Sequence, residues 1–108
     1  PGRENASLRN ANLKRAKLKQ ASLNRTNLAQ ANLTRANLTE AKLRRVNLKG
    51  ANLTRSNFKT SILQEVNLSG ANLTRADFTN AKFENVWLIG AIYCSTKMPW
   101  GVESPNCK

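Results

Sequence analysis

Residues 31 to 55 read ANLTR-ANLTE-AKLRR-VNLKG-ANLTR, five pentads with a central leucine and an alanine or valine two places before it. The pattern extends in both directions from this stretch. Leu or Phe stands at every fifth position from Leu8 to Leu88, and Tyr93 completes eighteen pentads. The position two places before the centre is always Ala, Ser, Thr or Val, and the other three positions are mostly polar. This five-residue repeat decides the fold.

A period of five fits neither an α-helix nor a continuous β-strand. On a helix, successive leucines would drift by about 140° around the cylinder and leave no apolar face. On a strand, side chains alternate between the two sides, so an odd repeat would send each leucine to the opposite side. The chain must therefore turn a corner in every pentad, so that the small residue and the central residue both point inward each time.

A second period of twenty residues predicts that four corners close one coil. The pentad ANLTR recurs identically at residues 31 to 35, 51 to 55 and 71 to 75. Twenty residues are four pentads, so the predicted coil is four-sided. The residue types that recur at this spacing are arginine at 15, 35, 55 and 75, glycine at 50, 70 and 90, and a β-branched residue at Thr26, Val46, Val66 and Val86.

Tandem pentads of this regularity resemble the pentapeptide-repeat proteins. The resemblance implies an all-β fold, a right-handed quadrilateral β-helix of about four and a half coils with a short C-terminal cap. It divides the chain into a lead-in at residues 1–5, a β-helix at 6–93 and a cap at 94–108. The central residues are expected to stack inside, while the β-branched residues fill one inner corner. The predicted core stack includes Leu28, Leu48, Phe58, Leu68, Phe78 and Phe83.

The two cysteines, Cys94 and Cys107, lie beyond the regular pentads in a chain with no other cysteine. This isolation predicts one disulfide that closes the cap, with Tyr93, Met98 and Trp100 as apolar cover for the last coil. Two free structural thiols are the alternative. A metal site in which the two cysteines supply half of the ligands is disfavoured, because the chain has no histidine and no further cysteine.

The tail also resembles the C-terminal disulfide bracket of cyanobacterial pentapeptide-repeat proteins, a Cys-x-Thr-x-Met-Pro-x-Gly run that leads to a second cysteine. Trp100 departs from that pattern, in which an aspartate is expected. The resemblance implies export to the periplasm or the thylakoid lumen, where disulfides persist. Met98 is the only methionine, so we expect Pro1 to follow a removed segment such as an export signal. The matching residues are Cys94, Thr96, Met98, Pro99, Gly101 and Cys107.

Charge is unevenly distributed along the chain. Eighteen Lys and Arg against six Asp and Glu give a formal net charge of +12. Residues 1–59 hold fourteen basic and two acidic side chains, whereas residues 60–108 hold four of each. A half-molecule this positive attracts polyanions or an acidic protein face, although charge of one sign also serves simply to keep a protein in solution.

The composition argues against catalysis. The chain has no histidine, and its six carboxylates are scattered over different pentad positions without a pair at the spacing of a general acid and base. The glycines stand singly and form no phosphate-binding loop. We therefore predict neither an enzyme nor a cofactor.

The repeat of twenty aligns the four arginines in one column. The face that carries this column, continued by Lys14, is the candidate partner-binding surface. We expect an interaction scaffold that binds an acidic protein, with polyanions or anionic membrane surfaces as the alternative. A solvated arginine column copied by repeat duplication also stays open. Mimicry of DNA toward topoisomerases, an idea attached to acidic members of the family, has the wrong sign here. Specific nucleic-acid binding is disfavoured because Trp87, Tyr93 and Trp100 lie in the neutral half. An end-to-end dimer is left open.

Overall fold

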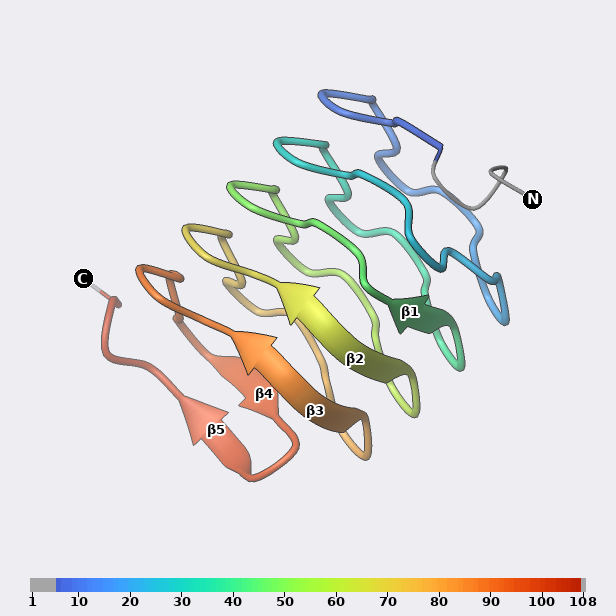
Figure 1. Cartoon of the computed structure of the whole chain (residues 1–108). Coiled ribbons are helices and arrows are strands. Elements are labelled where there is room, and N and C mark those ends of the chain that lie inside the picture. The colour runs from blue at the N-terminus through green and yellow to red at the C-terminus, as the bar shows by residue number, and fades with distance from the viewer. Residues whose placement is uncertain (1–5, 108) are drawn as a thin grey trace.

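The computed structural model describes residues 6–107, so the predicted lead-in at 1–5 lies outside the described residues, as does residue 108. The described chain is all-β and winds as a stack of coils (Figure 1). Strands β1, β2 and β3 form one parallel sheet in that order, and β4 and β5 pair antiparallel at the C-terminal end. The strands are β1 (Lys42–Arg44), β2 (Ile62–Asn67), β3 (Lys82–Trp87), β4 (Thr96–Met98) and β5 (Gly101–Glu103).

Neighbouring coils are paired with an offset of twenty residues. Leu43 of β1 lies beside Leu63 of β2, which lies beside Phe83 of β3. Isolated parallel bridges outside the strands keep the same offset; for example, Asn12 pairs with Asn32, and Asn32 pairs with Asn52. Each sequence column at a spacing of twenty is therefore a physical column along the stack.

The chain turns because the fifth residue of each pentad adopts a left-handed backbone. In a typical corner, the N–H of Ala31 donates to the carbonyl of Leu28 at 3.0 Å. Gln30, inside this turn, has a φ of 62°, a conformation that favours glycine. Glycine takes the equivalent position only at 50, 70 and 90, so most corners accept the cost of a side chain at positive φ.

Asparagine before the central residue helps to hold the corner. The Oδ1 atom of Asn52 accepts hydrogen bonds from the N–H of Thr54 at 3.1 Å and from its hydroxyl at 2.6 Å. Such a bond from a side chain to the backbone two residues on mimics a turn of the main chain. Asn27, Asn37 and Asn57 make the same backbone contact, which explains why asparagine dominates this position of the repeat.

One column of corners is built differently. The corner before Thr26 is closed by a turn hydrogen bond of 3.1 Å, whereas β1 ends just before the corner at Val46, and β2 and β3 run through the corners at Val66 and Val86. The residues before the central position of these corners are Lys42, Ile62 and Lys82 in place of asparagine. The chain still bends within these strands, since Glu65 and Asn85 both have a φ of 55°.

The interior is an apolar stack that is most completely closed in the middle of the molecule. Leu28, Leu48, Phe58, Leu68 and Phe78 are all fully buried. Burial falls at the ends, since Leu8 is 36% exposed and Phe83 is half-buried. Three of the four predicted corner fillers, Thr26, Val46 and Val66, are buried, and Val86 is half-buried.

The disulfide between Cys94 and Cys107 is present and ties the chain end to the last coil. Met98 is buried, and Tyr93 is half-buried. Trp100 is 58% exposed, but its ring meets that of Phe83 edge-on with centroids 5.7 Å apart. Trp100, where an aspartate was expected, thus covers the aromatic core residue Phe83.

Candidate basic surfaces

The structure brings the four predicted arginines into one column at a corner of the coil, which we call the arginine ladder. Arg15, Arg35, Arg55 and Arg75 are all exposed, and their φ angles lie between 59° and 61°. Their corners are closed by turn hydrogen bonds of 2.9 to 3.0 Å. Among residues 6–107, the ion pairs are Arg45 with Glu65 and Lys59 with Asp77, so none involves the arginine ladder. Its charges are available to another molecule.

The column beside the arginine ladder is polar and locked. Lys14 begins it, and Thr34, Thr54 and Thr74 follow at the same position of the coil. Each threonine hydroxyl donates at 2.6 Å to the asparagine two residues before it, which fixes the threonine rotamers. The arginine ladder therefore lies beside a column of fixed side chains. A ligand that binds the ladder would not have to order its backbone.

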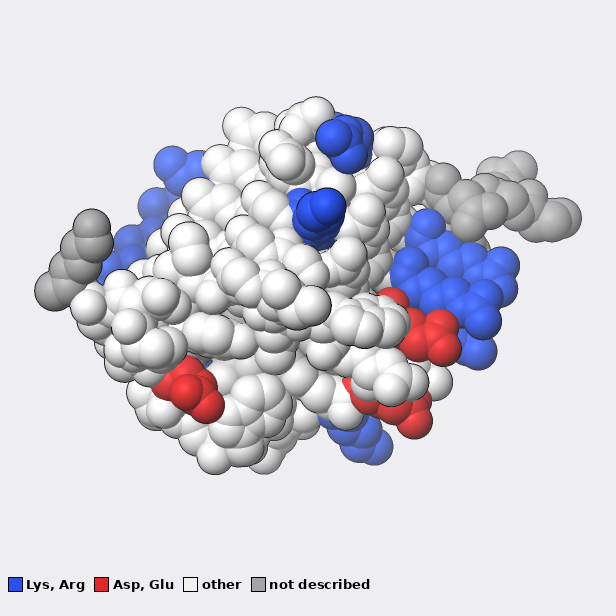
Figure 2. All heavy atoms as spheres, turned by 60° about the vertical axis from the view of Figure 1, so that its left-hand side comes forward, with Lys and Arg blue, Asp and Glu red and all other residues white. Residues whose placement is uncertain are grey.

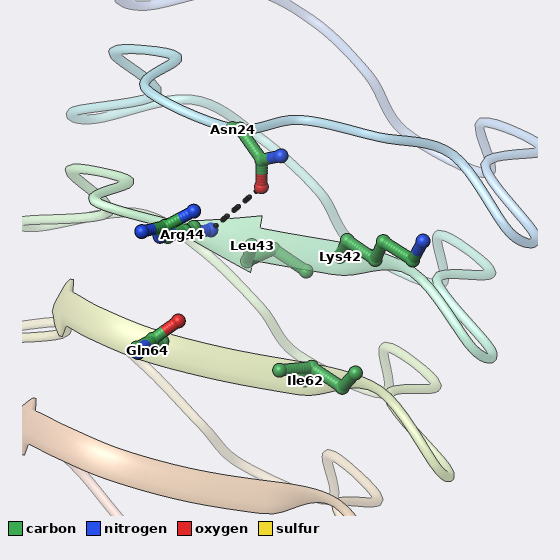
Figure 3. A pocket seen from close by; sticks show the side chains of 6 residues that line it. All are labelled: Asn24, Lys42, Leu43, Arg44, Ile62 and Gln64. Atoms are coloured by element: carbon green, nitrogen blue, oxygen red, sulfur yellow. Dashed lines mark hydrogen bonds between the residues drawn. The ribbon is translucent and has the colours of Figure 1, made fainter.

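A second basic surface, which we call the basic hollow, lies on the face where positions 22, 42, 62 and 82 are not asparagine. It is a hollow of about 310 Å³ over β1 and β2 (Figure 3). The Oδ1 atom of Asn24 accepts the backbone N–H of Arg44 at 3.1 Å. This contact leaves the side-chain NH₂ of Asn24 as a donor. The lining residues are Asn24, Lys42, Leu43, Arg44, Ile62 and Gln64.

The lining of the basic hollow has two positive charges and no carboxylate. Ile62 is 40% exposed, so the floor is partly apolar. Beside it, Arg45 is already paired with Glu65 at 2.9 Å. Sequence reasoning missed this surface because neither Lys42 nor Arg44 recurs as an unbroken column. The missing asparagine at 22, 42, 62 and 82 is the signal that marks the face.

Figure 2 shows how these charges are distributed around the molecule. On one side, basic side chains form a row, and on the opposite side they form a compact cluster next to acidic side chains. The area between them is mostly uncharged in this view. The molecule therefore presents basic surfaces on more than one side.

Asp77 is the acidic group whose environment is most clearly defined. Burial alone would raise the pKa of its carboxyl, but hydrogen bonds from the hydroxyl and the backbone N–H of Thr79 lower it, as do Lys59 and Lys97. The net effect holds the pKa of Asp77 below its ordinary value. Asp77 thus replaces asparagine as a corner acceptor, and its contacts are those of a structural group.

Burial raises the pKa of Tyr93, and the nearby carboxylate of Glu103 raises it further. Both residues belong to the capped end of the molecule. Residues 6–107 contain no group of three or more His, Cys, Asp or Glu side chains that could hold a metal ion. Nor does this part of the chain contain a helix long and apolar enough to cross a membrane.

Comparison with protein families gives two matches. A model described as pentapeptide repeat region matches residues 4–73, and one described as pentapeptide repeats matches residues 63–92. No curated protein matches the chain.

Several solved structures are similar to the chain, and two of them are described here. One is a pentapeptide repeat protein from the Arabidopsis thaliana thylakoid lumen, 24% identical, with a TM-score of 0.76 over 80% of this chain and 60% of that protein. The other is a pentapeptide repeat protein from Nostoc PCC 7120, 28% identical, with a TM-score of 0.54 over 76% of this chain and 64% of that protein. The chain thus spans less than two thirds of the length of either structure.

Proposed function

This chain belongs to the pentapeptide-repeat family, whose members are generally non-catalytic scaffolds, and from that premise we propose that it binds an acidic protein through the arginine ladder. In this role the β-helix contributes a rigid, regularly spaced surface. We assign no substrate or cofactor to it.

The proposal includes the finer architecture implied by the repeat. The β-helix is right-handed and quadrilateral, with about four and a half coils over residues 6–93, and residues 94–108 form the cap. The register of twenty residues between coils supports this arrangement. Four arginines at one corner would then be separated by roughly the spacing of adjacent strands, about 4.8 Å.

The observation that carries the proposal is a row of exposed guanidinium groups that have no acidic partner among residues 6–107. Like charges in adjacent strands repel one another, so the row has an electrostatic cost in the free molecule. An anionic partner would remove that repulsion. Arginine presents a planar fork of donors that matches a carboxylate bidentately, which makes acidic side chains on a protein suitable ligands.

We further propose that the chain functions in an oxidising compartment, the periplasm or the thylakoid lumen. The disulfide between Cys94 and Cys107 supports this location, because disulfides are rare where thiols are kept reduced. An acidic partner in the same compartment is therefore the first to be sought.

Binding of polyanions or anionic membrane surfaces is the second candidate function. The basic hollow favours it, since an extended anion could contact positive charge on a second side of the molecule. DNA mimicry is not proposed, because a net charge of +12 is opposite in sign to that of nucleic acid.

A pair of double variants tests the role of the arginine ladder. Arg35→Gln with Arg55→Gln removes two charges from the ladder, whereas Lys42→Gln with Arg44→Gln removes two from the basic hollow. Both should fold as the parent does, because all four side chains are exposed. In cross-linking capture from the exported fraction, only the ladder variant should lose the acidic partner. If the hollow variant alone loses it, the proposed surface is wrong.

Salt dependence distinguishes the two candidate functions. Binding of heparin or of phosphatidylglycerol vesicles should weaken steeply between about 50 and 200 mM salt, as counterion release requires. A packed contact with an acidic protein should weaken far less. Retention of the parent on heparin in high salt with no captured protein would contradict both expectations.

A further inference from the structure

Ile62 is an exposed apolar residue in the middle of the stack. It is 40% exposed, although it lies in β2, which is paired on both sides. Among residues 6–107, the other exposed large hydrophobic residues are Leu8 in the first coil and five side chains between Trp87 and Val102 at the C-terminal end. The ends of a solenoid lack one neighbouring coil, which explains exposure there. This explanation does not apply to Ile62.

The repeat places a polar residue at the position that Ile62 occupies. From Ser7 to Lys82, the position before the central residue is Asn, Asp, Lys or Ser in every other pentad. Preference for a β-strand does not account for the isoleucine, because Lys42 of β1 and Lys82 of β3 hold the same position on the two sides of Ile62. A single exposed apolar side chain is ordinary by itself. Ile62, however, lines the basic hollow, where it lies among positive charges.

Lys42 and Arg44 bring these charges close to Ile62. Lys42 is its partner across β1 and β2, and Arg44 stands two residues further along β1 on the same outward face. Two residues of a strand span about 6.6 Å and neighbouring strands lie about 4.8 Å apart, so a ligand that covers Ile62 can reach both charges. Figure 3 shows Lys42 and Arg44 on β1, with Ile62 and Gln64 on the strand beside it and Asn24 on the preceding coil.

Asn24 and Gln64 add amide groups at the Arg44 end of the basic hollow. The Oδ1 atom of Asn24 accepts the N–H of Arg44 at 3.1 Å, which fixes the amide and leaves its NH₂ to donate. Gln64 lies beside Arg44 in the register of β1 and β2. A guanidinium fork next to an amide donor matches the two oxygens of a carboxylate.

Acidic side chains near the basic hollow do not neutralise it. Neither of the ion pairs among residues 6–107 involves a residue that lines the hollow. Glu65, at the adjoining corner, is paired with Arg45 at 2.9 Å. Glu84 lies beside Gln64 on the side away from Arg44. Its negative charge directs the anionic end of a ligand toward β1 and leaves the apolar part of the ligand over β2.

We propose that the basic hollow binds a small organic acid, a carboxylate with an apolar body. The carboxylate is bound by Arg44, Lys42 and the NH₂ of Asn24, and a short aliphatic chain or one aromatic ring covers Ile62. The hollow of about 310 Å³ is at the lower end of the range for ligand pockets, and about ten to fifteen non-hydrogen atoms fill it. A lipid with two long chains is therefore too large.

The basic hollow and the arginine ladder occupy different columns of the coil, and a small molecule tests the hollow without a protein partner. The outcome is therefore independent of the proposed function. Binding by the hollow requires both halves of the ligand, because the carboxylate alone meets exposed charges in water and the apolar body alone meets a single isoleucine.

Titration of the isotope-labelled, oxidised chain with phenylpropanoate in about 150 mM NaCl, followed by NMR, tests the proposal. The side-chain NH₂ of Asn24 and the backbone amides of Ile62 and Arg44 should shift together. The shifts should saturate with a Kd on the order of 1 mM, as expected for a ligand of about eleven non-hydrogen atoms. Acetate carries the charge alone and phenylpropanol carries the ring alone. Each should bind at least about tenfold more weakly.

Two pairs of matched variants locate the site. Ile62→Asn introduces the residue that the repeat favours at this position, and Ile92→Asn makes the same change where isoleucine is 41% exposed at the C-terminal end. Arg44→Gln removes a charge from the basic hollow, and Lys49→Gln removes one from an exposed side chain at the same pentad position on the next face. Ile62→Asn and Arg44→Gln should each weaken phenylpropanoate binding at least about fivefold, and the two controls by less than about twofold.

Four results would overturn the proposal. The first is no saturable shift up to about 20 mM phenylpropanoate. Equal binding of acetate would show only a diffuse attraction of anions to a basic protein, and equal binding of phenylpropanol would show only an apolar contact. The fourth is binding that persists unchanged in both Ile62→Asn and Arg44→Gln, which would place the ligand elsewhere on the molecule.

Discussion

The rings of Phe58 and Phe78, twenty residues apart in the sequence, stack inside the molecule with their centroids 4.8 Å apart and their planes inclined by 20°. This separation is close to the spacing of hydrogen-bonded strands, so the aromatic stack and the backbone pairing impose the same rise per coil. Phe83 continues the cluster, meeting Phe78 edge-on at 5.4 Å. Side-chain packing and backbone register therefore support each other in the C-terminal half of the stack.

Leu48→Ala should destabilise the protein by roughly 2 to 5 kcal/mol, because Leu48 is fully buried in the middle of the stack and truncation leaves a cavity. Leu8→Ala is the matched control. Leu8 is 36% exposed in the first coil, and its truncation should cost less than about 1 kcal/mol. Urea denaturation followed by circular dichroism measures both, and equal losses would mean that the coils do not differ in packing.

Asn52→Ala should cost about 1 kcal/mol, because it removes the acceptor for the backbone and hydroxyl of Thr54. Asn52→Asp should be better tolerated at neutral pH, since Asp77 performs the same task for Thr79. Lys17→Ala, at the same pentad position on another face, should change stability by less than about 0.5 kcal/mol. A similar cost for all three substitutions, measured by thermal denaturation, would show that the asparagine bond does not stabilise the corner.

Stability should fall in acid partly through Asp77. Its folded-state pKa lies below the ordinary value of 3.8, so the carboxylate stabilises the fold above that pH and loses this contribution as pH falls through the folded-state pKa. Asp77→Asn removes this dependence. The melting temperatures of parent and variant should therefore converge, or change order, below about pH 3.8. A constant difference from pH 7 to pH 2 would exclude the effect.

Reduction of the disulfide should lower the free energy of unfolding by roughly 3 kcal/mol, since Cys94 and Cys107 are 13 positions apart and close a short loop. Intact mass measurement after alkylation without reductant should find no modified cysteine. Recovery of both residues as alkylated thiols from native protein would remove the disulfide and, with it, the support for an oxidising compartment.

Much of the fold was predictable because its signal is repeated. The prediction of a four-sided coil follows from a central apolar residue that recurs eighteen times and from columns such as the arginine ladder. The disulfide was predictable because two cysteines stand alone at one end. The physical cause is local in both cases: corner geometry explains the coil, and chain closure explains the disulfide.

The features that escaped sequence reasoning depend on single positions. The basic hollow forms where Lys42 and Ile62 replace asparagine, and no unbroken column of basic residues predicts it. The valine column was expected to fill an inner corner, but that β2 and β3 run through this corner depends on how the two strands pair. The contact between Trp100 and Phe83 requires the path of the cap, which no periodic signal specifies.

The offset of twenty residues between coils constrains how such a chain can change in length. Insertion of one pentad would rotate everything after it by one side of the coil, so valines would meet asparagine corners and the arginine ladder would break. Insertion of twenty residues would restore every column and only lengthen the stack. A change in length by whole coils therefore keeps every column aligned. A single pentad gained or lost before the cap would also shift Thr96 and Lys97 away from Leu73 and Phe78, with which they are hydrogen-bonded.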